Sequence, residues 1–207
     1  MGATQYTEGR LRRFILLHYR ERLLPKLCLP GHASWHPVGM GIPVPGGDGE
    51  KGGSIDLLFM SSRADLLLVE IKRRESSERA QQPIEQAYRY WNGLCRYLTP
   101  EELRTELAKK WRKKGIWQHV RKPNGDGFVS RLFTKAMEQL FGPRHETLLA
   151  SALAGIGQGR RMTLIAQNGC LHLKTVDAIR KERQRNPCIW GVQVSFPRGQ
   201  SAEWQVF

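Results

Sequence analysis

The stretch from residue 52 to residue 74 constrains the fold of this chain more than any other. Two apolar runs, at residues 55–60 and 66–71, flank a short polar segment at residues 61–65. Apolar runs of this length, joined by a few polar residues, are typical of a β-hairpin. The sequence therefore predicts two paired strands around which the rest of the chain is organised.

Three charged residues interrupt these apolar runs: Asp56, Glu70 and Lys72. Because side chains alternate faces along a strand, Glu70 and Lys72 lie on the same face and Ile71 lies on the opposite one. Asp56 reaches that face too if the register of the two strands allows it. An isolated buried charge costs several kcal/mol, so we expect this cluster to serve a purpose.

A divalent cation is one explanation of the cluster. Two carboxylates at close range repel each other, and Mg²⁺ takes hard oxygen ligands, often one or two carboxylates with water and substrate phosphate. Lys72 beside such an ion can hold a water molecule or stabilise charge that develops on phosphorus. A structural ion pair between Lys72 and either carboxylate is the alternative, and these residues by themselves leave both interpretations open.

The order of these residues resembles the signature of the PD-(D/E)XK nuclease superfamily. In this chain the signature consists of Asp56 followed, one short strand later, by Glu70-Ile71-Lys72. The proline that usually precedes the aspartate is replaced by Ile55. The resemblance implies a site for Mg²⁺ or Mn²⁺ held by Asp56, Glu70 and the Ile71 carbonyl group, with Lys72 orienting the attacking water.

The resemblance extends into the helix predicted after the hairpin. Gln86 and Tyr90 match the Gln-x-x-x-Tyr motif of RecB-type members and lie four residues apart, on one face of that helix. In the resembling families this glutamine reaches the metal-bound water or the phosphate. The alternative is a surface Gln86 and a half-buried Tyr90. The resemblance covers residues 50–98, about a quarter of the chain.

Many members of the superfamily also place a helix before the hairpin and take a glutamate from it into the metal site. Residues 5–24 of this chain are predicted to form an amphipathic helix that Pro25 ends. Glu8 and Glu21 are the two candidates for that ligand. Glu8 lies in the first turn, where a carboxylate also simply suits the helix dipole.

The charge of the chain points to a polyanionic partner. Thirty-three Lys and Arg residues against nineteen Asp and Glu residues leave a net charge of +14. Nucleic acid is the partner that such a chain most often meets, and no apolar run approaches the roughly 18 residues of a membrane span. An acidic membrane surface is the competing partner, and solubility or host bias is the alternative explanation. The residues predicted to contact nucleic acid are Arg73, Arg74, Tyr90, Lys109, Lys110, Arg112, Lys113 and Lys114.

The basic run is interleaved with tryptophans, which suits nucleic acid because indole rings stack on exposed bases while cations meet phosphates. Trp111 and Trp117 can equally be core anchors beside a solvated basic face. The four cysteines are scattered without a Cys-x-x-Cys pair, so we expect free thiols in a reducing cytoplasm and no zinc site.

The order of elements predicts one α/β domain with a mixed central sheet flanked by helices. This order agrees with the αβββαβ restriction-endonuclease-like core that the resemblance implies. The core takes in residues 5–98 and 162–207, and residues 99–160 form a mainly helical insertion. The further elements expected are helices at 78–98 and 173–184 and strands at 35–38, 41–44, 162–168, 189–196 and 204–207.

Together these features predict a cytoplasmic Mg²⁺- or Mn²⁺-dependent deoxyribonuclease, a hydrolase that cleaves phosphodiester bonds. RNA as a substrate, endonuclease or exonuclease action, and a homodimer or a larger nuclease complex are left open. A non-catalytic nucleic-acid-binding module with the same fold is the alternative, and a basic subunit of a larger complex is a third. Intact Asp56, Glu70 and Lys72 argue against the binding module, since a degenerate site is expected to have lost at least one of them.

Overall fold

The computed structural model describes residues 8–27, 35–46, 52–61, 65–72, 81–96, 102, 161–168, 173–195 and 202–207. In chain order the described elements are helix α1 (Glu8–His18), a π-helical turn (Tyr19–Leu23), a 3₁₀ turn (Leu24–Leu27), β1 (His36–Val44), β2 (Gly53–Met60), β3 (Leu66–Lys72), α2 (Gln82–Arg96), β4 (Arg161–Asn168), α7 (Leu173–Arg185), β5 (Ile189–Ser195) and β6 (Glu203–Val206).

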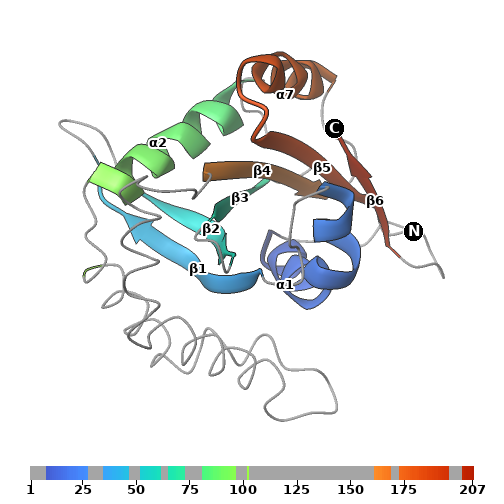
Figure 1. The fold of residues 1–207 in the computed structure, drawn as a ribbon, viewed down its shortest axis with the longest axis horizontal. Helices are drawn as coiled ribbons and strands as arrows, with labels where there is room; N and C mark the ends of the chain where they lie inside the picture. Colours follow the sequence, from blue (N-terminus) through green and yellow to red (C-terminus); the bar gives the residue numbers. More distant parts are fainter. Residues whose placement is uncertain are drawn as a thin grey trace, which may run out of the picture.

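The strands form one six-stranded open sheet in the order β1-β2-β3-β4-β5-β6 (Figure 1). β1, β2 and β3 pair antiparallel, β3, β4 and β5 pair parallel, and β6 returns antiparallel to β5. The α/β class with a mixed sheet is thereby confirmed. Because β3 pairs with β4, the two sequence segments predicted as core, 5–98 and 162–207, contribute to the same sheet.

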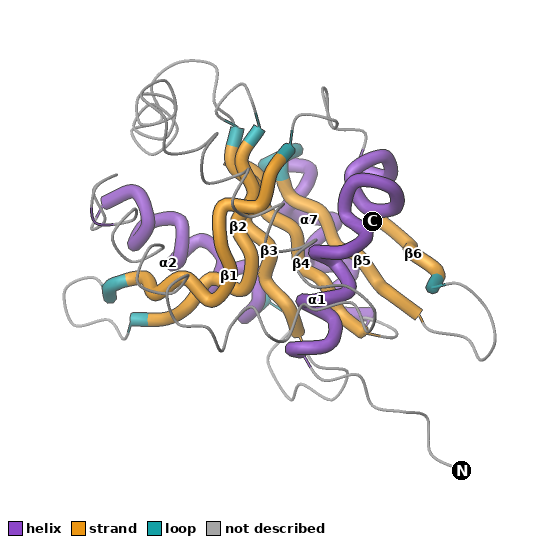
Figure 2. Tube along the Cα trace, turned by 90° about the horizontal axis from the view of Figure 1, so that it is seen from below, coloured by secondary structure: helices purple, strands orange, loops and turns teal. Residues whose placement is uncertain are grey.

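Helices cover both faces of this sheet, with α1 on one face and α2 and α7 on the other (Figures 1 and 2). Leu11 and Ile15 of α1 pack with Val69 and other residues of the central strands. On the opposite face Leu94 of α2 packs with Leu68 in a second cluster, and α7 packs there in a third. The sheet is thus the middle layer of three.

β3 lies in the centre of the sheet and every one of its residues is buried. A strand covered on both faces is apolar throughout rather than alternating, which explains its continuous run of Leu and Val. The predicted hairpin is confirmed, because β2 and β3 pair antiparallel in the register Met60↔Leu66 to Leu57↔Val69. Glu70 and Lys72 are therefore charges inside the most buried strand of the sheet.

The first helix differs from the single helix predicted over residues 5–24. Regular α-helix ends at His18, and the chain goes on as a π-helical turn and then a 3₁₀ turn that contains Pro25. Proline lacks an N–H and its ring clashes with the carbonyl group four residues earlier, so a straight α-helix cannot run through this position. The predicted helix was therefore too long: Pro25 lies within the 3₁₀ turn, and its clash reaches back only to residue 21, so it does not account for the end of regular helix at His18.

β1 also differs from expectation, since it is one continuous strand rather than two short pieces. The glycines and prolines of this segment suggested an interruption, but the strand continues through them. It does so with a register shift between Pro37 and Gly39 and a positive φ of 56° at Gly41. Bulges and glycines of this kind let a strand bend without ending it.

Of the insertion predicted over residues 99–160, only Glu102 lies among the described residues, and the other positions fall outside them. Among the helices that the structure describes, none combines the length and the apolar character that crossing a membrane requires.

Candidate active site

The two predicted carboxylates lie at the point where the pairing of β2 with β3 ends. The last pair of the ladder is Leu57↔Val69, so Asp56 and Glu70 occupy the next positions on the two strands. In place of a backbone bond, the Ile71 N–H donates to Oδ2 of Asp56 at 2.8 Å. Asp56 is therefore fixed by its own side chain to the backbone of the Glu-x-Lys strand.

The other oxygen of Asp56 is bound by a residue that sequence reasoning did not select. The Arg12 guanidinium group, on the second turn of α1, donates to Oδ1 of Asp56 and forms an ion pair with it. The side chain of Arg12 is 25% exposed and that of Asp56 is 13% exposed. The available signal was the i, i+4 spacing of Glu8 and Arg12, which puts both side chains on one face of the helix.

The pKa of Asp56 reflects these neighbours. Burial raises the pKa of its carboxyl group above the ordinary value, and the carboxylate of Glu8 acts in the same direction. The Arg12 guanidinium and the Ile71 N–H act in the opposite direction, because both stabilise the ionised form. Glu8, the predicted glutamate of the first helix, is thus close enough to influence Asp56 electrostatically.

Lys72 is the centre of a second set of contacts, on the face of the sheet that α2 covers. Its Nζ lies 3.1 Å from Oε1 of Glu70 and donates to Oε1 of Gln86 at 2.6 Å. Nε2 of Gln86 in turn donates to the hydroxyl oxygen of Tyr90 at 2.5 Å. Four of the residues predicted from the motif therefore form one chain of contacts.

These four residues are largely withdrawn from solvent. Glu70 is 3% exposed, Lys72 7% and Tyr90 5%, and Gln86 is half-buried. The predicted alternation is confirmed, because Val69 and Ile71 belong to the apolar cluster under α1 while Lys72 contacts α2. Two charges buried this deeply are tolerated only when they are paired and hydrogen-bonded.

The ring of Tyr90 packs on the backbone of β2. A Cβ atom added to Gly53 would lie 2.2 Å from Cε1 of Tyr90, so only glycine leaves room for the ring. Tyr90 therefore holds the amide of Gln86 from a buried position.

The side chain of Glu21 lies outside the described residues. So do the other residues predicted to contact nucleic acid, which are Arg73, Arg74, Lys109, Lys110, Arg112, Lys113 and Lys114.

The two carboxylates are hard oxygen donors, the kind of ligand that a divalent cation such as Mg²⁺ takes. Asp56 and Glu70 occupy adjacent positions on neighbouring strands, but their side chains make different contacts. Asp56 bonds to Arg12 of α1, whereas Glu70 pairs with Lys72, whose other contact, Gln86, belongs to α2. Within the described ranges, no three His, Cys, Asp or Glu side chains gather closely enough to hold a metal ion. A cation here would therefore have one or two carboxylates, completed by backbone oxygen, water or phosphate, as Mg²⁺ often does.

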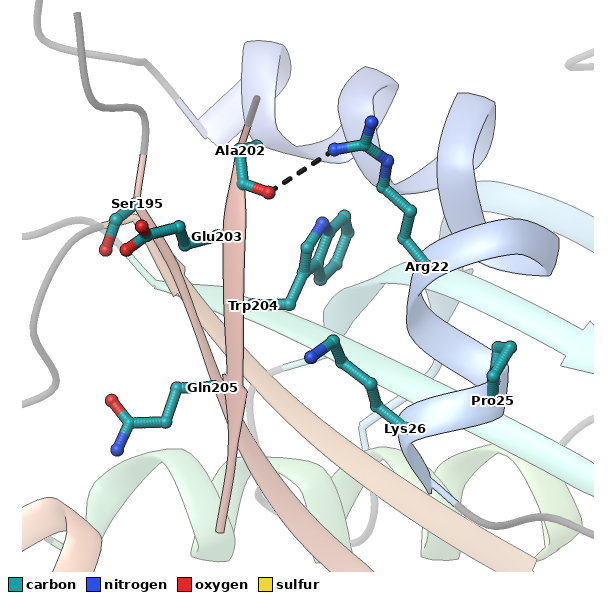
Figure 3. Close-up of a pocket in the computed structure, with 8 residues that line it drawn as sticks. All are labelled: Arg22, Pro25, Lys26, Ser195, Ala202, Glu203, Trp204 and Gln205. Atoms are coloured by element: carbon teal, nitrogen blue, oxygen red, sulfur yellow. Dashed lines mark hydrogen bonds between the residues drawn. The ribbon is translucent and has the colours of Figure 1, made fainter. Parts of the chain in front are cut away.

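A cavity of about 630 Å³ lies elsewhere, against the edge strand β6 (Figure 3). It contains none of the residues predicted for the site. Arg22 crosses it to donate to the Ala202 carbonyl oxygen at 3.3 Å. The residues that line it are Arg22, Pro25, Lys26, Ser195, Ala202, Glu203, Trp204 and Gln205.

The chain matches no model of a known protein family, and a search of curated proteins finds no match either. The function is therefore inferred from the residues of the site and their geometry.

Proposed function

We propose that this chain is a metal-dependent nuclease that hydrolyses DNA phosphodiester bonds with Asp56, Glu70 and Lys72, on a restriction-endonuclease-like αβββαβ core. The observation that carries the proposal is the meeting of β2, β3 and α2 around a buried Glu70–Lys72–Gln86 chain beside Asp56. Charges are costly in a strand that is buried throughout, and a structural role does not require this many polar groups at one point.

In this proposal Asp56 and Glu70 hold Mg²⁺ or Mn²⁺, with the Ile71 carbonyl as a further ligand. Such an ion, when bound, polarises the scissile phosphate and stabilises the charge of the pentacovalent transition state. The Ile71 N–H contributes by fixing one oxygen of Asp56, so the carboxylate keeps its orientation when its other contacts change. The carboxylate of Glu8 acts on Asp56 electrostatically.

Lys72 orients the attacking water. Its ammonium group is held between Glu70 and Gln86, so its position does not depend on a long flexible side chain alone. Tyr90 accepts the hydrogen bond from Nε2 of Gln86, and this directs Oε1 of the same amide towards Lys72. The positioning of one catalytic group by two others is the kind of support that sites need for efficient catalysis.

A non-catalytic nucleic-acid-binding module with the same fold is the second candidate. The observation that favours it is the neutralisation of both carboxylates within the protein, Asp56 by Arg12 and Glu70 by Lys72. Buried ion pairs of this kind occur without any catalytic role, because each carboxylate keeps its partner.

The test compares the wild type with Asp56→Asn and Lys72→Met, which keep the size of each side chain. Asp177→Asn and Lys181→Met on the exposed surface of α7 are the matched controls. Plasmid DNA and linear single- and double-stranded DNA are incubated with each protein and with Mg²⁺, Mn²⁺ or EDTA. We expect metal-dependent cleavage by the wild type and both controls, and a loss of at least about 100-fold in both site variants.

Two results would contradict the nuclease. If the wild type binds DNA but cleaves none of the substrates, the binding module is the better description. If Asp56→Asn and Lys72→Met cleave as fast as their α7 controls, the chemistry is not at this site.

A further inference from the structure

Arg12 binds the oxygen atom of Asp56 that the backbone of β3 leaves open to a metal ion at the proposed site. Oδ2 of Asp56 accepts the Ile71 N–H, and Oδ1 accepts the Arg12 guanidinium group. A divalent cation placed against Oδ1 would meet a like charge at contact distance. In a partly buried site that repulsion is only weakly screened. The cation and the guanidinium group therefore compete for this oxygen.

We propose that Arg12 is an exchangeable counter-ion: it holds Asp56 in the metal-free protein, gives up the carboxylate when a divalent cation binds, and then contacts a phosphate group of the DNA. The inference rests on the proposed function and deepens it, because it makes metal binding and DNA binding depend on each other. Arg12 is a positioning residue in this scheme rather than a metal ligand.

The position of Arg12 allows the exchange. Its side chain is 25% exposed, so the guanidinium group can leave Asp56 towards solvent without crossing the core. It is attached to α1, while both strands that carry the carboxylates belong to the sheet, so its departure breaks no strand pairing. Asp56 keeps its orientation meanwhile, because the Ile71 N–H holds its other oxygen.

The chemistry of the guanidinium group suggests the second partner. Within the part of the chain that the structure describes, Nε of Arg12 is buried and makes no hydrogen bond, so the contact with Asp56 does not satisfy all five donors. A phosphate offers the bidentate acceptor geometry that guanidinium groups match best. A DNA strand whose scissile phosphate lies at the metal brings such acceptors to the place that Arg12 has just left.

This scheme makes a thermodynamic demand on the wild-type site. Arg12 competes with the cation when DNA is absent and is drawn away from it when DNA is present. DNA must therefore raise the affinity for the metal, and the metal must raise the affinity for DNA by the same factor. A purely structural Arg12–Asp56 ion pair makes no such demand.

The test measures the affinity for Mn²⁺ by calorimetry, first without DNA. Arg12→Gln should bind Mn²⁺ at least about tenfold more tightly than the wild type, because a competing positive charge is removed. Arg180→Gln, on the exposed surface of α7, should leave the affinity unchanged. The inference is overturned if Arg12→Gln binds Mn²⁺ no more tightly than the wild type.

The second measurement adds a short DNA duplex, with Lys72→Met as the background so that the strand stays intact. The duplex should raise the Mn²⁺ affinity by about tenfold or more, and Arg12→Gln in this background should remove most of that increase. Arg12→Lys should keep the weak affinity without DNA but show a smaller increase with it, since an ammonium group cannot bind phosphate bidentately. If the duplex leaves the Mn²⁺ affinity of Lys72→Met unchanged, the inference is overturned, even if Arg12→Gln fails to fold.

Asp56→Asn separates this inference from the proposed function. If it binds Mn²⁺ as the wild type does, the ion is not held here and both proposals fail. If Asp56→Asn loses Mn²⁺ binding while Arg12→Gln leaves it unchanged, the metal site stands and only the exchange is wrong.

Discussion

The ammonium group of Lys72 lies between two acceptors that come from different elements, Glu70 on its own strand and Gln86 on α2. A lysine in water rotates among many conformers, and fixing it has a substantial entropic cost. In this protein the ion pair with Glu70 and the hydrogen bond to Gln86 offset that cost, because Lys72 is buried and water competes little for its ammonium group. The contacts with Glu70 and Gln86 therefore fix the position of the Lys72 ammonium group, which is proposed to orient the water.

Gln86→Met tests this placement, because methionine keeps the length of the side chain and removes the acceptor. We expect kcat to fall by about 10- to 100-fold with little change in KM, since a misplaced catalytic group affects the transition state more than substrate binding. Steady-state cleavage kinetics measure it. Gln82→Met, one turn earlier and exposed, is the control, and equal effects of the two variants would refute the role of Gln86.

Tyr88 provides a second contact at the residue scale, between α2 and α7. Its hydroxyl group donates to Oε1 of Glu182 at 2.7 Å and accepts from Nδ2 of Asn186 at 3.1 Å. Burial raises the pKa of Tyr88, and the hydrogen bond to Glu182 adds to the shift. The neutral phenol is thus the form that the fold favours.

Tyr88→Phe should lower the free energy of unfolding by about 1 kcal/mol at pH 7, the usual net contribution of a hydrogen bond. Because the pKa is higher in the folded state, the contribution is complete below the unfolded pKa of about 10 and is lost as pH rises through the folded value. Urea unfolding of both proteins at pH 7 and above pH 10 measures this. A difference that grows at alkaline pH would contradict it.

At the scale of the elements, the site depends on how closely α2 approaches the sheet. Trp91 of α2 donates through Nε1 to Oγ1 of Thr163 on β4 at 2.9 Å, and this contact is buried. Two glycines permit the approach. A Cβ on Gly53 of β2 would meet the ring of Tyr90 at 2.2 Å, and a Cβ on Gly93 would meet Cγ1 of Val44 at 2.2 Å.

Gly53→Ala should destabilise the fold by about 1–3 kcal/mol, because an overpacked contact has to be relieved by movement of α2 or of the ring. It should also lower kcat in the protein that remains folded, since Tyr90 holds Gln86 in place. Thermal unfolding and cleavage rates are measured together. Gly93→Ala is the matched control, and we expect it to lose stability while keeping kcat; a retained kcat in both variants would disconnect Tyr90 from the site.

For the whole molecule, the net charge of +14 is the dominant property. A protein that neutralises several phosphates releases counter-ions, so its affinity for DNA falls steeply as salt rises. The basic residues predicted for this contact are concentrated between residues 109 and 114. A second set of exposed basic residues lies on α7, near the C-terminal end of the sequence: Arg180, Lys181, Arg183 and Arg185.

Replacing the basic residues at 109–114 with glutamine should lower the affinity for DNA. It should also reduce the slope of log affinity against log salt, by roughly 0.9 for each phosphate of duplex DNA that is no longer neutralised. The variant carries Lys109→Gln, Lys110→Gln, Arg112→Gln, Lys113→Gln and Lys114→Gln. The control replaces Arg180, Lys181, Arg183 and Arg185 of α7. Fluorescence anisotropy between about 50 and 200 mM salt measures both. An equal decrease from the two sets would mean that charge acts without a defined binding surface.

The sequence by itself predicted β2 to β6, the presence of α1, α2 and α7 with different ends, and the grouping of Glu70 with Lys72. These follow from local periodicity, because alternation along a strand needs no knowledge of the rest of the chain. The sequence predicted β1 as two short pieces. The order of elements also indicated the α/β class. The resemblance predicted that Gln86 reaches the metal-bound water or the phosphate, and the structure shows instead a hydrogen bond between Gln86 and Lys72.

Only the tertiary structure decided that Asp56 bonds to the Ile71 N–H and to Arg12. The first contact depends on where the β2–β3 ladder ends, and the second joins residues 44 positions apart. Such contacts are set by the register of the hairpin and by the way α1 crosses the sheet, and neither is encoded in a local pattern. The sequence thus specified which charged residues lie in the central strands. The packing of α1 decided that Arg12 is the basic residue that pairs with Asp56 of β2.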